Sequence, residues 1–236
     1  MVQRSKGHSA VAADRARVRL HDRRLERTHM PLPVKRGSAP ILSEVLLPEG
    51  APERWRDREE LWNEVEVREG RHDAGLAREV EFALPAELLP EQAAALARDY
   101  VLAAFVAKGM AADLNVHWAL RDDGRPKPYA QALLTLRRAG PEGFGLKERV
   151  WNDRANAVRW RRLWAEMANA RLAAHGHAAR VDHRSHAERG ITLETQNKIG
   201  PNAARRARRG EPSERVDEHH AIARRNRERA APGGGA

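Results

Sequence analysis

Apolar residues recur along this chain with two different periods, and each period predicts a different kind of element. Residues 76–84 alternate apolar with polar side chains and stop at Pro85, which is typical of a half-buried strand. Three other stretches also indicate strands: 41–47, 111–119 and 129–137. Asp123 and Gly124 lie between the last two, so a tight turn should join them as a hairpin.

Apolar positions three and four residues apart predict helices over about 52–69, 90–108, 152–174 and 216–229. Gly109 is placed to end the second of these helices. A basic stretch over 9–25 predicts another helix with Ser9 as its N-cap. Residues 31–40 and 140–145 are expected to be loops, and 178–181 a short strand. This order predicts an α+β fold, an antiparallel sheet with helices packed on one face.

Charge and composition narrow the classes of partner. The chain of 236 residues has 43 Lys and Arg against 33 Asp and Glu, a formal net charge of +10. Such an excess indicates a polyanionic partner, with DNA or RNA the first candidates. The absence of cysteine excludes disulfides, thiolate zinc sites and cysteine nucleophiles. No apolar run approaches the roughly 18 residues of a membrane span, and the polar N-terminus has no signal-peptide core, so we expect a cytoplasmic protein.

The strand pair at 111–119 and 129–137 carries the features that most narrow the function. From Gly109 the sequence is Gly-Met-Ala-Ala-Asp-Leu-Asn-Val-His-Trp, and from Lys127 it is Lys-Pro-Tyr-Ala-Gln-Ala-Leu-Leu-Thr-Leu-Arg. This core resembles the metal site of the MobA/MobL relaxases, which nick plasmid DNA for conjugative transfer. Further segments resemble that family in the same order: 2–13, 51–63, 76–85, 144–152 and 180–185. The resemblance covers about residues 2 to 200.

The resemblance implies a five-stranded palm-like sheet, a tyrosine nucleophile near the N-terminus, and a divalent metal (Mn, Mg or Zn) held by three histidines. His117 stands at the first of these metal positions, whereas Tyr129 and Gln131 stand at the other two. Both are poor ligands beside histidine, so His117 is expected to be a weak metal ligand at most. Tyr129 is expected to fill space in place of a histidine, with a displaced nucleophile as the alternative.

The N-terminal segment departs from the family in a second way. The family's tyrosine has no counterpart there, because the chain has only Tyr100 and Tyr129, and Tyr100 is expected to lie in the core. The family's first strand would precede Met1, so we expect the sheet to lack its N-terminal strand. The resulting open edge would favour dimerisation or lower the stability.

Two functional hypotheses follow from the resemblance. One is an enzyme of plasmid mobilisation that binds origin DNA and nicks one strand with a tyrosine and a divalent metal. The alternative is a non-catalytic DNA-binding pseudoenzyme, or a decayed copy of the enzyme. The expected partners are single-stranded or origin DNA and other relaxosome proteins; a general basic nucleic-acid-binding protein is a third class that the resemblance disfavours.

Basic side chains at both ends of the chain are the candidate contacts for DNA phosphates. The candidates are Arg4, Lys6, Arg15, Lys127, Arg205 and Arg206. The sequence predicts a relaxase-like domain over 1–195, followed by a basic, polar and partly disordered helical tail over 196–236.

Overall fold

The computed structural model describes residues 1–13, 18–30, 39–121 and 123–230 of the chain. The chain divides into two compact units, Met1–Asp182 and His183–Ala236. Arg15 and the expected tail at 232–236 lie outside the described residues. The functional division expected near residue 195 remains a prediction.

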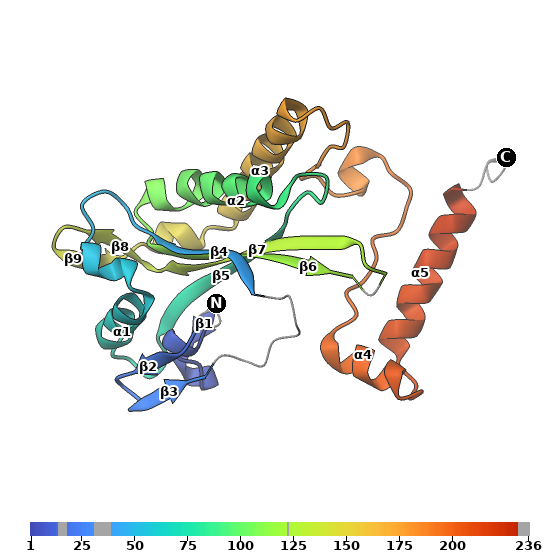
Figure 1. The fold of residues 1–236 in the computed structure, drawn as a ribbon. Helices are drawn as coiled ribbons and strands as arrows, with labels where there is room; N and C mark the ends of the chain where they lie inside the picture. The colour runs from blue at the N-terminus through green and yellow to red at the C-terminus, as the bar shows by residue number, and fades with distance from the viewer. Residues whose placement is uncertain (14–17, 31–38, 122, 231–236) are drawn as a thin grey trace. The chain divides into compact units, whose positions relative to one another are not determined.

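A five-stranded antiparallel sheet forms the centre of the first unit (Figure 1). Its strands, in spatial order, are β1 Val2–Gln3, β5 Gly75–Ala83, β7 Pro126–Thr135, β6 Ala112–Leu120 and β4 Pro40–Leu46. The four strands predicted from apolar patterns over 41–137 are thereby confirmed. The predicted hairpin between β6 and β7 is also confirmed, with Gly124 in a left-handed conformation (φ 80°) that suits glycine.

The edge of the sheet beside β5 differs from what the sequence led us to expect. The two residues of β1 occupy it, with Val2 paired to Ala77 and Gln3 to Gly75. An N-terminal strand is therefore present, although it is much shorter than β5, which continues past the pairing to Ala83. Val2 is buried, because it packs among the apolar residues beneath the sheet.

Helices α2 Pro90–Ala104 and α3 Arg154–Ala174 cover one face of the sheet, as predicted (Figure 1). Leu114 and Val116 of β6, and Leu134 of β7, pack against Leu96 of α2 in the larger apolar core. The short 3-10 turn Val106–Lys108 extends α2 and ends at Gly109, whose φ of 96° is accessible to glycine.

A second, smaller core lies on the opposite face of the sheet, beneath α1 Arg58–Arg68. Leu61 and Trp62 of α1 pack there with Leu133 of β7. The helix predicted over 52–69 is confirmed in its main part and is preceded by the 3-10 turn Glu53–Arg56. One helix therefore packs on the face where none was expected.

The helix predicted over 9–25 is wrong in the part of it that the structure describes. Its described residues include the 3-10 turn Val11–Ala13 and β2 Leu20–Asp22, which pairs as a hairpin with β3 Arg27–His29. The 3-10 turn Arg4–Lys6 precedes this segment. Ser9 caps no α-helix: its hydroxyl donates to the buried carboxylate of Asp22 and accepts from the backbone N–H of Ala12, in the 3-10 turn, at 3.4 Å. Side-chain hydrogen bonds of this kind compete with helical backbone pairing.

Two smaller predictions are also wrong. Residues 140–145 belong to a hairpin of β8 Arg137–Gly140 and β9 Gly143–Lys147, and Phe144 stacks on Trp55 with ring centroids 4.1 Å apart. Residues 178–181 form no strand, since the backbone of Val181 bonds instead to the Asn169 side chain at 2.7 and 2.9 Å. The 3-10 turn Arg149–Asn152 leads into α3.

The second unit contains the 3-10 turn Ala187–Arg189, α4 Pro201–Arg208 and α5 Glu214–Ala230. The helix predicted over 216–229 is confirmed, and α4 lies within the stretch 196–236 that was expected to be a helical tail. Glu194 lies in the segment before α4 and contacts α5, because its carboxylate pairs with Arg225 at 2.7 Å and with Arg229 at 2.8 Å. Among the described residues, no helix is long and apolar enough to cross a membrane.

Candidate nucleic-acid site on the sheet

One face of the central strands builds the larger core, and the other carries polar side chains beside the smaller core. Alternate residues of β6, Leu114 and Val116, face α2 and α3 because side chains of a strand alternate between faces. The intervening residues face the other way and form a surface that we call the polar face. Its members are Ser43, Glu79, Glu81, Asp113, Asn115, His117, Lys127, Tyr129 and Gln131.

His117 and Tyr129 lie directly opposite each other on β6 and β7. Their rings stack with centroids 4.8 Å apart and an angle of 18° between the planes. His117 is 1% exposed, and Tyr129 is half-buried. The phenol therefore fills the position at which the resemblance implies a second metal histidine, and it covers one side of the imidazole.

Gln131 occupies the next inward position on the same face of β7. It lies between Asn115 of β6 and Glu81 of β5, and its Nε2 donates to Oε2 of Glu81 at 3.1 Å. The amide is therefore held in a bond between strands. A glutamine side chain gives a metal only a neutral amide oxygen, which suits hard cations and is a weaker donor than imidazole for Mn²⁺ or Zn²⁺.

These side chains do not fit the metal that the family resemblance implies. The three ligand positions hold one imidazole, one phenol stacked on it, and one amide bonded to a carboxylate. Within the described ranges, no group of three His, Asp or Glu side chains is placed to hold a metal ion. The arrangement can bind and position a ligand, but it lacks the imidazole set of the implied metal site.

The polar face includes a buried ion pair. Asp113 is fully buried, and its carboxylate accepts from Arg58 at 3.2 Å and from the indole of Trp62 at 3.0 Å. The amide of Asn115 donates to Asp113 at 3.3 Å and accepts from the Ser43 hydroxyl at 2.7 Å. Sequence reasoning missed this network, although polar residues alternating with Leu114 and Val116 were a signal for it.

Tyr100, the other tyrosine of the chain, lies in the core as expected. It is buried between α2 and α3, and its hydroxyl donates to the carbonyl of Trp160 at 3.1 Å. Burial raises the pKa of the Tyr100 phenol well above its ordinary value. A phenolate nucleophile is therefore strongly disfavoured at this position.

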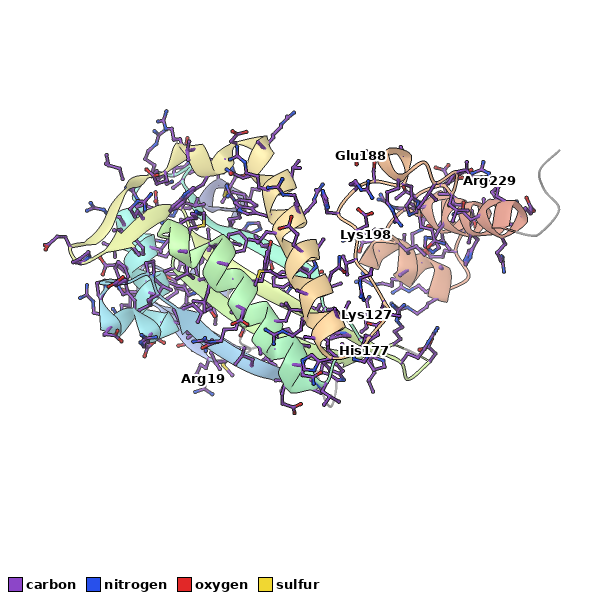
Figure 2. All side chains as sticks on the ribbon, turned by 90° about the horizontal axis from the view of Figure 1, so that it is seen from above. Arg19, Lys127, His177, Glu188, Lys198 and Arg229 are labelled. Carbon is purple, nitrogen blue, oxygen red and sulfur yellow. The ribbon has the colours of Figure 1, made fainter. Side chains whose placement is uncertain are left out.

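The basic residues chosen from the sequence lie in very different surroundings. Lys6 is exposed, and Lys127 is exposed on the polar face, two positions before Tyr129 (Figure 2). Arg4 is instead engaged inside the protein: its guanidinium donates to the Glu66 carboxylate at 2.6 Å and to backbone carbonyls of Glu66, Glu69 and Arg71. Its donors serve to anchor the N-terminal segment.

Arg205 and Arg206 lie exposed on α4 of the second unit. Arg206 is 3.5 Å from Glu211, so part of its charge is compensated within the unit. The first unit thus brings His117, Tyr129, Gln131 and Lys127 together on one face, and the second unit carries exposed arginines on α4.

Comparisons with known proteins agree with this fold and give the family of the chain. A family model described as the MobA/MobL family matches residues 7–209. Mobilization protein MobL of Acidithiobacillus ferridurans is 38% identical over 91% of this chain and 64% of its own length. Conjugal transfer protein TraA of Rhizobium radiobacter is 33% identical over 89% of this chain and 22% of its own length. The chain therefore spans less than two thirds of these relatives.

A solved structure has the same fold. A chain described under "Molecular Basis of Vancomycin Resistance Transfer in Staphylococcus aureus" superposes with a TM-score of 0.70 and 30% identity, over 78% of this chain and 95% of that one. The expected palm-like α+β fold is thereby confirmed.

Proposed function

We propose that this chain, which belongs to the MobA/MobL family, binds the DNA of a mobilisable element at its transfer origin and holds it without metal-dependent cleavage. The observation that carries the proposal is the stacking of Tyr129 on His117. It places a phenol against the one imidazole that remains of the expected metal site.

The DNA-binding part of the proposal is supported by charge and by the relatives. The formal net charge is +10, and Lys127 and Lys6 are exposed in the unit that carries the polar face. Relatives across most of this chain are named mobilization and conjugal transfer proteins. Exposed lysines and arginines supply phosphate contacts and give affinity that depends on salt. We leave Arg4 out of this contact set because its donors are engaged with Glu66 and backbone carbonyls.

The second part, binding without cleavage, is supported by the donor set. A metal-dependent nickase needs a bound cation to polarise the scissile phosphate and a nucleophile to attack it. Tyr129 stacks on His117, and Gln131 donates a hydrogen bond to Glu81. Both stand at positions where the family resemblance implies imidazole ligands. Tyr100 is buried in the core.

We further propose that residues 196–236 act as a basic arm that adds DNA contacts. Arg205, Arg206, Arg208 and Arg209 lie within one short stretch that includes α4, with Glu211 beside them. Other relaxosome proteins are proposed partners by the same family relationship.

A gel experiment tests the proposal directly. The protein is incubated with fluorescein-labelled single-stranded and duplex oligonucleotides from a cognate origin, with and without Mn²⁺. The expected result is a salt-sensitive complex that denaturant dissociates completely. Binding to neither DNA would refute the DNA-binding function, and cleaved strand or a denaturant-resistant adduct would refute the absence of cleavage.

The second candidate function is a nicking enzyme. The observation that favours it is His117, which stands fully buried on β6 at the family's first ligand position. Under this hypothesis, Mn²⁺-dependent cleavage appears in the same gel and is lost in His117→Ala.

A further inference from the structure

A cavity separate from the His117–Tyr129 stack opens beside the N-terminal segment of the first unit. Its volume is about 290 Å³, near the small end of the range for ligand pockets. Three elements form its walls: the 3-10 segment with His8 and Ala12, the β2–β3 hairpin with Leu25 and Arg27, and β5 with Glu79.

A buried carboxylate fixes the polar wall of this cavity. Asp22 is fully buried and accepts from the Ser9 hydroxyl and from the backbone N–H of Leu25 at 3.0 Å, and Nε2 of His29 lies 3.5 Å from its carboxylate. Such a carboxylate orients an imidazole and sets which nitrogen carries the proton.

His29 in turn positions Arg27. The Arg27 guanidinium lies 3.4 Å from Nδ1 of His29. Because arginine can only donate, Nδ1 is the acceptor, and the proton of neutral His29 is assigned to Nε2, on the side of Asp22. Arg27 is exposed, and it keeps further N–H donors for a ligand in the cavity. A guanidinium held in this way suits a phosphate, which accepts two parallel hydrogen bonds.

Apolar side chains form part of the cavity wall, beside the carboxylate of Glu79. Leu25 is 43% exposed, and Ala12 adds a small side chain at the rim, so a flat ring can lie against this surface. Glu79 joins the cavity to the polar face, because it lies on β5 two positions before Glu81, which bonds to Gln131. A strand of DNA lying along the polar face would therefore pass the cavity.

We propose that this cavity takes one nucleotide of single-stranded DNA, with its phosphate against Arg27 and His8 and its base against Leu25 and Ala12. The proposal rests on the proposed DNA-binding function and names a subsite for it. A base within a duplex is paired and stacked and must leave the helix to enter a pocket. The subsite therefore favours single strands over duplex.

The test compares two cavity variants with two matched controls. Arg27→Gln removes the phosphate donor, and Ala12→Phe fills the cavity from its rim. Arg162→Gln and Ala95→Phe make the same changes at exposed positions on α3 and α2, on the helix face of the sheet. The probes are fluorescein-labelled oligo(dT) of twenty nucleotides, a duplex of equal length, and free dTMP as competitor, read by fluorescence anisotropy.

Arg27→Gln is expected to weaken oligo(dT) binding about tenfold relative to Arg162→Gln, in line with loss of a charged hydrogen bond. Ala12→Phe should remove the preference for the single strand and leave duplex binding unchanged. Competition by dTMP at millimolar concentration that is lost in Ala12→Phe would support a pocket for the nucleotide itself. If only unlabelled oligo(dT) competes and dTMP does not, the contact lies on the phosphodiester backbone.

The subsite is overturned if both folded cavity variants, verified by circular dichroism, bind oligo(dT) as tightly as their controls. That result leaves the proposed function standing. Wild-type protein that binds neither oligo(dT) nor duplex would instead refute the DNA-binding function on which the subsite rests.

Discussion

The imidazole of His117 and the phenol of Tyr129 stack 4.8 Å apart from directly opposite positions of β6 and β7. The contact has two consequences. It packs a phenol against one side of the buried imidazole, and it places that phenol at the position of a second metal ligand. A tyrosine here stabilises the sheet, whereas a histidine would build a metal site.

Weak metal binding is the first prediction from this contact. One imidazole holds Mn²⁺ or Zn²⁺ poorly, since stable sites use three or four ligands. Isothermal titration of the wild type with Mn²⁺ or Zn²⁺ should show no 1:1 site with a dissociation constant below about one micromolar. Tyr129→His with Gln131→His should raise the affinity at least tenfold. A tight wild-type site that disappears in His117→Ala would mean that other side chains complete the coordination.

A second prediction concerns the salt dependence of DNA binding. The logarithm of the affinity falls linearly with the logarithm of the salt concentration, and each phosphate contact that is removed makes this slope shallower by about 0.7 to 0.9. Arg205→Gln with Arg206→Gln should therefore reduce the magnitude of the slope by roughly one to two. The matched control is Arg161→Gln with Arg162→Gln on α3. Equal slopes for the two double variants would remove α4 from the DNA contact surface.

The third prediction assigns Arg4 and Glu66 to stability. Glu66 is 2% exposed, and its carboxylate accepts from Arg4 at 2.6 Å, from Arg24 at 2.8 Å and from the backbone N–H of Ala10. Glu66→Ala leaves Arg4 without its carboxylate partner and should cost about 3 to 5 kcal/mol of unfolding free energy.

Glu64→Ala is the control for this variant. Glu64 forms an exposed pair with Arg54 at 3.9 Å, and its loss should cost less than about 1 kcal/mol in urea denaturation. Similar midpoints for Glu64→Ala and Glu66→Ala would contradict the structural role of the buried pair.

The fourth prediction is a pH dependence carried by Asp22. Burial raises the pKa of its carboxyl, but hydrogen bonds from Ser9, Leu25 and His29 outweigh burial and hold the pKa below the ordinary value of 3.8. The unfolded chain therefore binds this proton more readily than the folded one. The stabilisation is present above pH 3.8 and is lost as the pH falls below it, through the folded pKa.

Urea titrations at several pH values between 5 and 2.5 test this dependence. Asp22→Asn should be less stable than wild type at pH 5, and its stability should fall less steeply with acid. Parallel curves for the two proteins would show that Asp22 does not contribute to acid unfolding.

The sheet was predictable because its signal is local. Alternation over 76–84 and the turn at Gly124 each lie within one short stretch of sequence, and both were confirmed. The N-terminal hairpin was not predictable in this way, since the segment is held by Glu66, more than fifty residues away. Local periodicity carries no information about such a partner.

The candidate site was predictable only in part for the same reason. The identities of His117, Tyr129 and Gln131 follow from the sequence. Their contacts depend on the register of β5, β7 and β6, which sets Tyr129 against His117 and Gln131 against Glu81. Likewise, Arg4 is one of several similar N-terminal arginines until the fold places it beside Glu66.

The last prediction concerns restoration of chemistry. If the fold persists and only the reacting groups are absent, replacing them should return activity. Tyr129→His with Gln131→His rebuilds the pair opposite His117, and insertion of the family's Ala-Tyr segment after Ala13 supplies a nucleophile. Either change alone should do little, because a nucleophile and the group that activates its target act as one unit. Together they should give a covalent adduct with single-stranded origin DNA in Mn²⁺, seen as a band that survives denaturant.

The unmodified protein is the control for restoration. If it already forms the adduct, another residue acts as the nucleophile, and the proposal of binding without cleavage is wrong. If the rebuilt protein is folded, binds Mn²⁺ at micromolar concentration and binds DNA, yet forms no adduct, then the polar face does not present the phosphodiester to a nucleophile placed after Ala13. In that case the DNA strand follows a different path across β5, β7 and β6, and the phosphate contact proposed for Lys127 must be reassigned.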